Sequence, residues 1–233
     1  MLVKSLCLIG ICSAIGYSVI PTCWYKVKRR LNRTDTEEKK IYLTFDDGPD
    51  KRFTEELLDL LKKYNIKVTF FVVAKFAENN LDIIKRMKQE GHLIGFHSLE
   101  HKNALWQTPS YTKNDFKRSQ DIFKKIEVNI KFFRPPWGHF NLETLNCVKK
   151  YSFKTVLWNV MAEDWRGNTT WQEIAQKLIN RTRNGDIICL HDGRGVNNAP
   201  GRTIDALEAV LPIWISQGYE FARMDDVCIR KIV

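Results

Sequence analysis

The sequence predicts an α/β protein in which helices cover a parallel sheet. Over most of the 233 residues, short apolar runs rich in strand formers alternate with longer amphipathic segments, in about seven β/α units. Strict alternation of this kind is typical of parallel sheets, because each helix returns the chain to the start of the next strand. The length is enough for one large domain, built either as a barrel or as a doubly wound sheet.

The elements of the first half follow from apolar spacing and from turn residues. Ile41–Phe45 is rich in strand formers and is ended by Gly48-Pro49. Leucines on one side of Phe53–Tyr64 predict a helix. The same criteria predict strands at Val68–Val73 and Leu93–Phe96, a helix at Asn79–Glu90 that ends before Gly91, and a helix at Thr112–Glu127 that opens with the capping-box-like Thr112-x-x-Asp115.

The second half repeats the pattern with shorter strands. A capping box, Thr170-x-x-Glu173, marks the start of a helix at Thr170–Arg183, and Gly185 follows its end. The remaining predicted strands are Lys131–Arg134, Lys154–Trp158, Asp186–Leu190 and Glu220–Arg223, and the remaining helices are Leu142–Lys150 and Arg202–Gln217.

The sequence divides into an apolar segment over residues 1–25, a charged linker over residues 26–40 and a folded domain over residues 41–233. The 21 residues from Ser5 to Tyr25 carry no charge and are long enough to cross a bilayer as a helix. They show no convincing small-x-small cleavage site, so an uncleaved membrane anchor is predicted in preference to a cleaved signal. The heavier positive flank follows the segment and, by the positive-inside rule, would keep the domain in the cytoplasm.

Composition excludes several classes of function. The formal net charge is +10, but seven Lys/Arg and three Asp/Glu fall within residues 26–40, so the domain itself is only mildly basic. No basic stripe with interleaved aromatic residues occurs, which argues against nucleic acid as a partner. No Gly-x-Gly-x-x-Gly or Walker loop follows a strand, which disfavours nucleotide binding. The six cysteines form neither a disulfide framework nor a zinc pattern, and no obligate protein partner is evident.

Polar residues capable of chemistry follow five of the predicted strands. Taken alone, Asp46-Asp47 is also an ordinary turn signal. The carboxyl ends of parallel strands meet on one face, however, where active sites of barrels and open sheets are built. Five placements on that face favour a site over chance, whereas His92 and His139 lack such a context. The residues concerned are Asp46, Asp47, His97, His101, Arg134, Asp164 and His191.

These residue types suit metal-assisted hydrolysis. His97-x-x-x-His101 can bring two imidazoles to one ion, and Asp47 completes a two-histidine, one-carboxylate set that leaves positions open for water and substrate. Asp46 is then free to act as the base, and His191 can protonate the leaving group. Asp164 could orient His191, and Arg134 could pair with Asp46 and keep that carboxylate ionised.

Together these motifs resemble the polysaccharide deacetylases of carbohydrate esterase family 4, which share the NodB-like homology domain. Thr44–Pro49, His97-Ser98-x-x-His101, Arg134-x-Pro136-Trp137-Gly138 and Leu190-His191-Asp192 match four of the five family motifs, over about residues 41–211. The remaining motif, the fourth of the family, keeps Asp164-Trp165 but has Met161 where an Asp is usual, which puts the identity of the substrate in doubt more than the chemistry.

The resemblance implies a distorted (β/α)7-type barrel that holds one divalent ion, with Zn²⁺ expected and Co²⁺, Ni²⁺ or Mn²⁺ as alternatives. It implies Asp46 as base, His191 as acid, and Asp47, His97 and His101 as metal ligands. The backbone N–H of Trp137 would help to hold the oxyanion, and Leu190 and Trp165 would wall the pocket for the acyl methyl group.

The expected function is removal of N-acetyl groups from an N-acetylglucosamine-containing glycan, either peptidoglycan or a chitin-like oligomer. Three alternatives stay open: a deacylase of a lipid-linked sugar, a deacetylase of an O-acetylated polysaccharide, and a non-catalytic glycan-binding protein tethered to the membrane. Because relatives act on cell-wall glycans, the domain is expected on the outer face of the membrane, against the charge rule, or secreted if the N-terminal segment is cleaved.

Overall fold

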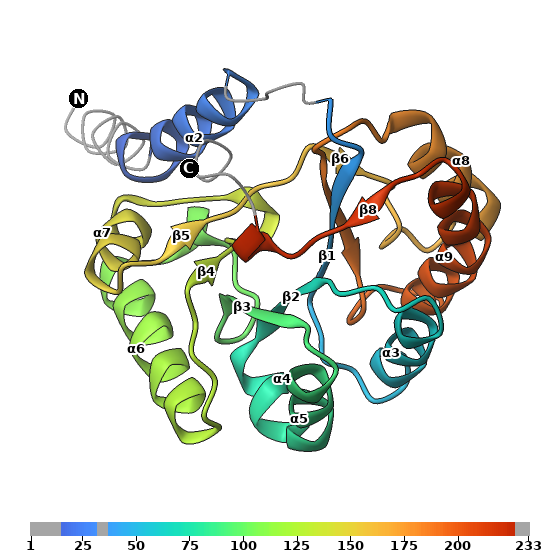
Figure 1. Ribbon diagram of the computed structural model, residues 1–233. Coiled ribbons are helices and arrows are strands. Elements are labelled where there is room, and N and C mark those ends of the chain that lie inside the picture. The colour runs from blue at the N-terminus through green and yellow to red at the C-terminus, as the bar shows by residue number, and fades with distance from the viewer. Residues whose placement is uncertain (1–14, 32–36, 227–233) are drawn as a thin grey trace.

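The computed structural model describes residues 15–31 and 37–226, in which eight strands form one parallel sheet (Figure 1). The strand order is β5-β4-β3-β2-β1-β7-β6, and β8 pairs with the start of β1. The predicted α/β fold with a parallel sheet is therefore confirmed. The strands are β1 (Lys40–Asp46), β2 (Thr69–Val73), β3 (Leu93–Ser98), β4 (Phe132–Phe133), β5 (Lys154–Thr155), β6 (Val160–Met161), β7 (Ile187–His191) and β8 (Glu220–Phe221).

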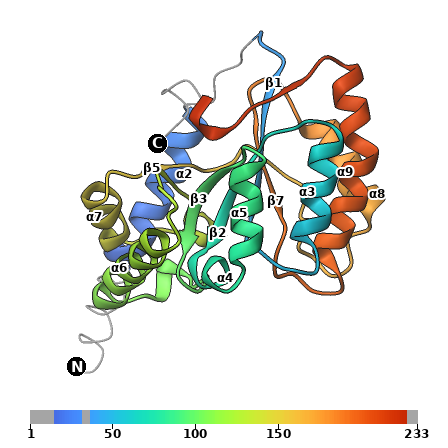
Figure 2. The ribbon, with the colours of Figure 1, turned by 60° about the horizontal axis from the view of Figure 1, so that its bottom comes forward.

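Helices surround the strands on the outside of the curved sheet, as the two ribbon views show (Figures 1 and 2). The helices of the domain are α3 (Thr54–Lys63), α4 (Ala74–Asn79), α5 (Leu81–Gln89), α6 (Pro109–Lys125), α7 (Leu142–Lys150), α8 (Trp171–Arg181) and α9 (Ala199–Ser216). Three-residue 3-10 helices lie at Ala104–Trp106, Pro136–Gly138 and Met224–Asp226.

Alternation along the strands builds two cores, one on each face of the sheet. On β1, Ile41, Leu43 and Phe45 pack against the helices in the larger core, whereas Tyr42 belongs to a smaller core inside the curve of the sheet. Successive side chains of a strand point to opposite faces. The inward-facing series Tyr42, Thr44 and Asp46 therefore leads from the inner core directly to the carboxyl end of the strand.

Within the described residues the strands form a half-barrel, because β5 and β6 end the sheet and do not pair with each other. The segment predicted as the strand Lys154–Trp158 lies at this gap in the sheet. Only Lys154 and Thr155 belong to a strand there. The N–H of Val156 still bonds to Phe133 on one side of the opening, but the N–H of Asn159 bonds to Ile187 on the other. A single crossing segment thus spans the opening.

Two helices begin earlier in the structure than the sequence predicts. Helix α6 begins at Pro109, three residues before the predicted start, and its N-cap is Thr108, whose hydroxyl accepts from the N–H of Tyr111, so Thr112-x-x-Asp115 is not its capping box. The predicted helix Asn79–Glu90 corresponds to α5, and the short helix α4 precedes it, separated at Asn80, whose side-chain amide donates to the carbonyl of Phe76. The last long helix begins at Ala199, three residues before the predicted start, and Pro200 occupies its first turn. Proline is well suited to a first turn, because the N–H that it lacks has no partner there.

The N-terminal part packs against the domain through a π-helical turn, Ile15–Val19, and helix α2 (Ile20–Leu31), so residues 26–31 of the predicted linker are helical. The Thr22 hydroxyl donates to the carbonyl of Phe140 and accepts from its N–H, at 3.0 and 2.8 Å. The Tyr25 ring stacks on the Phe140 ring with centroids 4.3 Å apart. No helix among the described residues is both long and apolar enough to cross a membrane. Residues 1–14 of the predicted anchor lie outside them.

Candidate active site

A cavity of about 730 Å³ lies at the carboxyl ends of the strands and is lined by most of the side chains that the sequence singles out, whereas Arg134 and Asp164 are fully buried and do not line it. Asp46 and Asp47 come from the end of β1, His97 and His101 from the end of β3 and its loop, and His191 from the end of β7. Other lining residues include Trp158, Met161, Arg166, Cys189, Arg194 and Val196, of which only Met161 was singled out from the sequence.

Asp47, His97 and His101 converge on one point. Oδ1 of Asp47 lies 3.2 Å from Nε2 of His97 and 2.9 Å from Nε2 of His101. Asp47 and His101 both have positive φ angles, 75° and 56°. Residues other than glycine adopt that region only where the surrounding structure imposes it, and such residues cluster at functional sites.

The same geometry fits a divalent metal ion. Nδ1 of His97 donates to the carbonyl of Arg134 at 2.7 Å, which leaves the lone pair of its Nε2 directed at Asp47. Burial lowers the pKa of His101, which keeps that imidazole in the neutral form that binds metals. Although burial opposes it, contact with His101 and His97 holds the pKa of Asp47 well below its usual range. Two imidazoles and one carboxylate are a donor set that Zn²⁺ accepts.

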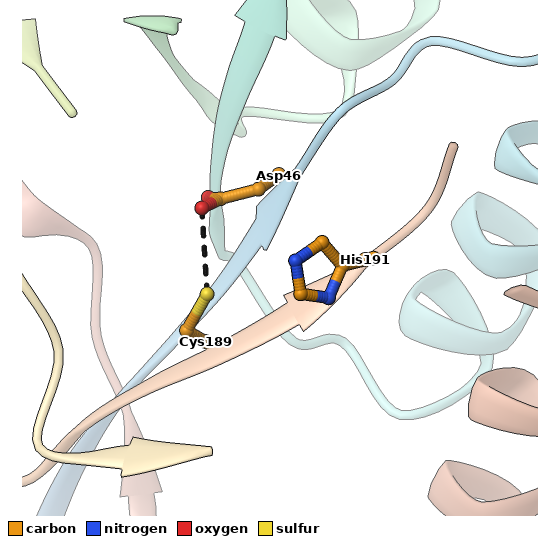
Figure 3. Close-up of side chains that lie close together, drawn as sticks. All are labelled: Asp46, Cys189 and His191. Carbon is orange, nitrogen blue, oxygen red and sulfur yellow. Dashed lines mark hydrogen bonds between the residues drawn. The ribbon is translucent and has the colours of Figure 1, made fainter. Parts of the chain in front are cut away.

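Asp46 is held by two groups beside this triad, Arg134 and Cys189. Nη1 of the fully buried Arg134 donates to Oδ1 of Asp46 at 2.7 Å, and also to the hydroxyl of Thr44. The Cys189 thiol donates to Oδ2 of Asp46 at 3.3 Å (Figure 3). That oxygen lies 4.0 Å from Nε2 of His97. The Asp46 carboxylate is thus oriented toward the triad, while its charge is balanced by the Arg134 guanidinium.

His191 and Asp164 form the predicted pair on the other side of the cavity. Nδ1 of His191 lies 3.0 Å from Oδ1 of Asp164, whose other oxygen accepts from the N–H of His191 and from the hydroxyl of Thr203. Burial of the ring opposes its charge, but the Asp164 carboxylate outweighs burial and raises the pKa of His191 to about 10. Near neutral pH the imidazolium can therefore donate a proton from Nε2.

Of the three residues that were predicted to contact the substrate, two line the cavity and one does not. Trp137 and Trp165 line the cavity, and the Trp137 ring lies 4.3 Å from that of His101. Leu190 does not line it, because its side chain is fully buried in the outer core. His191 points into the cavity, so strand alternation turns Leu190 toward the helices and Cys189 toward the cavity. Period-two alternation is the signal that could have identified Cys189 from the sequence.

The other missed residues had no such signal. Trp158 lies in the segment that crosses the opening of the half-barrel, and Arg166, Arg194 and Val196 lie in loops after β6 and β7. Loop residues show no periodic sequence pattern from which the direction of their side chains could be predicted. Arg194 nevertheless approaches the triad, with its Nε 3.8 Å from Oδ2 of Asp47.

Comparison with known proteins identifies relatives over most of the chain. Residues 33–156 match the family model for polysaccharide deacetylase. A peptidoglycan-N-acetylglucosamine deacetylase of Bacillus cereus is 34% identical over 196 residues, which are 83% of this chain and 90% of that protein. The peptidoglycan-N-acetylmuramic acid deacetylase PdaA of Bacillus subtilis is 33% identical over 84% of this chain and 74% of its own length.

Solved structures agree with these matches. A peptidoglycan N-acetylglucosamine deacetylase in complex with an N-hydroxybenzamide superposes with a TM-score of 0.74 at 30% identity, over 81% of this chain and 87% of that one. A family 4 acetyl xylan esterase of Clostridium thermocellum, in complex with cobalt, superposes with a TM-score of 0.72 at 35% identity, over 80% and 89%. The chain therefore belongs to the polysaccharide deacetylases of carbohydrate esterase family 4 and is a carbohydrate deacetylase.

Proposed function

We propose that this protein is a metal-dependent hydrolase that removes N-acetyl groups from an N-acetylglucosamine-containing glycan, with peptidoglycan as the first candidate and chitin-like oligomers as the second. The observation that carries the proposal is the convergence, in one cavity, of a two-histidine, one-carboxylate set with a carboxylate base on one side and a protonated imidazole on the other.

Asp47, His97 and His101 would hold the ion, with Zn²⁺ as the first choice. When bound, such an ion supplies a Lewis acid for the acyl oxygen and makes water more acidic. The protein residues supply the proton transfers. Asp46 takes a proton from the attacking water at Oδ2, while Arg134 holds the base in place through Oδ1.

Completion of the reaction needs an acid, because an amine is a poor leaving group without a proton. The water oxygen bonds to the acyl carbon, the carbon–nitrogen bond breaks, and Nε2 of His191 gives its proton to the departing amine nitrogen. Asp164 holds the opposite nitrogen, so the ring keeps its orientation throughout. Acetate and a free amino sugar are the products.

Two features support a glycan as substrate. Trp137 and Trp165 offer broad apolar faces in the cavity, which suit the apolar faces of sugar rings. Two of the relatives are named for N-acetylated sugars of peptidoglycan. Such a substrate would place the domain on the outer face of the membrane, or outside the cell if the N-terminal segment is removed.

O-deacetylation of a polysaccharide is the second candidate, favoured by the 35% identity with an acetyl xylan esterase. The same base and acid would act on an ester. Met161 lines the cavity but has no charged group that could recognise a substrate hydroxyl. This residue therefore does not select between an N-acetyl and an O-acetyl group.

The test is acetate release by the zinc-loaded protein from peptidoglycan, from N-acetylglucosamine oligomers and from O-acetylated xylan. Peptidoglycan or the oligomers should give the highest rate, and a chelator should abolish it until Zn²⁺ is restored. Asp46→Asn and His191→Ala should each retain one zinc per chain but lose at least about 10²-fold in kcat. Full activity in either variant, or release from xylan alone, would contradict the proposal.

A further inference from the structure

Helix α2 faces the domain with Pro21, Thr22 and Tyr25 and leaves a second set of apolar side chains facing outward. Ser18, in the preceding turn, and Thr22 are buried, and their hydroxyls bond to carbonyls of Leu105 and Phe140. By contrast, 60% of Ile20 and 53% of Trp24 remain exposed. An amphipathic helix of a globular domain normally presents polar side chains on its outward side.

The outward residues form one continuous stripe, which we call the α2 stripe: Ile20, Cys23, Trp24 and Val27. Their spacing of three, four and seven residues places them on one face of a helix, because each residue adds about 100°. Next to the start of the helix lies the 3-10 turn Ala104–Trp106, joined to it through the Ser18–Leu105 bond, and its Trp106 is 85% exposed.

Positive charge borders the α2 stripe. Lys26 and Lys28 fall on its two flanks by helical spacing, and Nζ of Lys28 lies 5.0 Å from the centre of the Trp24 ring. Arg29 and Arg30 follow in the sequence, and residues 5–14, ahead of the helix, carry no charge. Tryptophan and apolar side chains on one face with lysines beside them are the composition of helices that lie in a membrane interface.

We propose that the α2 stripe lies on the surface of an anionic lipid bilayer, parallel to the membrane plane. Residues 18–25 were predicted to belong to a membrane span, but the side that carries Thr22 and Tyr25 is bound to the domain, so this stretch would rest on the bilayer rather than cross it. The flanking lysines argue for anionic lipid over a second copy of the chain, because a two-fold contact would bring like charges together.

The cavity would then open close to lipid. Phe140, which carries the bonds to Thr22 and the stacked ring of Tyr25, lies three residues after Trp137 in the cavity wall. A bilayer under α2 would thus hold the catalytic loop at the membrane surface. This inference rests on α2 alone and does not depend on the proposed substrate.

Cys23 offers a direct test, because it lies in the α2 stripe and is exposed, whereas Cys147 and Cys189 are buried. In the full chain carrying Cys7→Ser, Cys12→Ser and Cys228→Ser, an environment-sensitive fluorophore is attached to Cys23. Vesicles of phosphatidylcholine with and without phosphatidylglycerol are added, and quenching by lipids bearing a shallow nitroxide is measured. The matched control adds Cys23→Ser and Ile213→Cys, which moves the label to an exposed apolar position on α9.

The proposal predicts that the Cys23 label shifts to the blue and is quenched by the nitroxide lipid, more strongly with anionic vesicles, while the label at position 213 does neither. Trp24→Ser together with Val27→Ser should weaken the response. The proposal is overturned if the protein co-sediments with vesicles but the Cys23 label stays as accessible to aqueous iodide as before. It is equally overturned if no vesicle binding occurs, or if light scattering shows a dimer that protects the label without lipid.

Discussion

At the scale of single residues, neighbouring positions of one strand have opposite roles. Cys189 and His191 face the cavity, and Leu190 between them belongs to the outer core. A sequence motif shows which residue types occur together but not which face each one takes. The catalytic set could be predicted from residue chemistry, whereas the wall residue needed the alternation of β7 as well.

This difference yields a prediction on β7. Leu190→Ala should lower the free energy of unfolding by about 2–5 kcal/mol, since it leaves a cavity in a packed core, while KM stays unchanged. Cys189→Phe should instead raise KM or abolish activity by filling the space beside Asp46, and Cys189→Ser, which keeps a donor to that carboxylate, should remain active. Denaturant unfolding and acetate-release kinetics on the same variants check both parts. A large rise in KM for Leu190→Ala would contradict the assignment.

A second prediction concerns the proton on His191. Burial alone would lower the pKa of this ring, and Asp164 reverses that effect. Asp164→Asn should therefore move the alkaline limit of kcat to lower pH and lower kcat at pH 8 by about 10²-fold or more. Thr203→Val removes one donor from the same carboxylate without removing its charge, and its profile should stay near that of the unaltered protein. A pH–rate profile from pH 5 to 10 distinguishes the two variants.

At the scale of elements, the length of a helix or strand determines whether its sequence pattern can be recognised. Helices such as α3 and α8 carry several turns of apolar periodicity, and both were predicted to within a few residues. Strands β5 and β6 have two residues each, which is too short for any period, so β5 was predicted too long, as Lys154–Trp158, and β6 was not predicted. The apolar N-terminal segment has a related ambiguity, because composition cannot separate a helix that enters a bilayer from one that docks on its own domain.

Docking of α2 gives a prediction at this scale. Tyr25 and Thr22 hold Phe140, which is fully buried and lies in the loop that carries Trp137. Tyr25→Ala should lower stability by about 1–3 kcal/mol and lower kcat by roughly tenfold, because the proposed oxyanion donor is held less firmly. Tyr25→Phe keeps the stacked ring and should restore both values. Trp24→Ala, on the outward side, should change neither. An unchanged kcat in Tyr25→Ala would show that the loop is held without α2.

At the scale of the whole molecule, the fold explains why distant motifs share one site. Because β1, β3 and β7 are parallel, their carboxyl ends deliver residues 46, 97 and 191 to the same edge. Alternating strands and helices were enough to predict this arrangement. They were not enough to predict the half-barrel, because the opening depends on one segment, residues 156–159, whose hydrogen bonds change from β4 to β7.

The response of the whole fold to acid depends on a residue far from the cavity. His92 is buried between β2 and β3, where its Nδ1 accepts from the N–H of Val68 at 3.3 Å and its ring meets the edge of Phe70. Burial lowers the pKa of His92 from 6.5 to about 4. Between those values the unfolded chain binds a proton that the folded chain does not, so stability falls as pH drops from about 6.5 to 4.

The size of this effect follows from the shift, which corresponds to about 3 kcal/mol. The substitution His92→Asn keeps an acceptor for the N–H of Val68 but introduces a side chain that cannot be protonated. It should therefore remove the part of the acid-induced loss of stability that His92 causes. Burial raises the pKa of both Asp115 and Asp192 to about 7, and these groups stabilise the fold as pH falls, but they do so equally in both proteins. The difference in unfolding free energy between His92→Asn and the unaltered chain, measured in urea at pH 7.5 and 4.5, therefore isolates His92. Relative to the unaltered chain, the variant should be more stable at pH 4.5 than at pH 7.5. A stability difference that does not change with pH would show that the folded protein accommodates a charged His92.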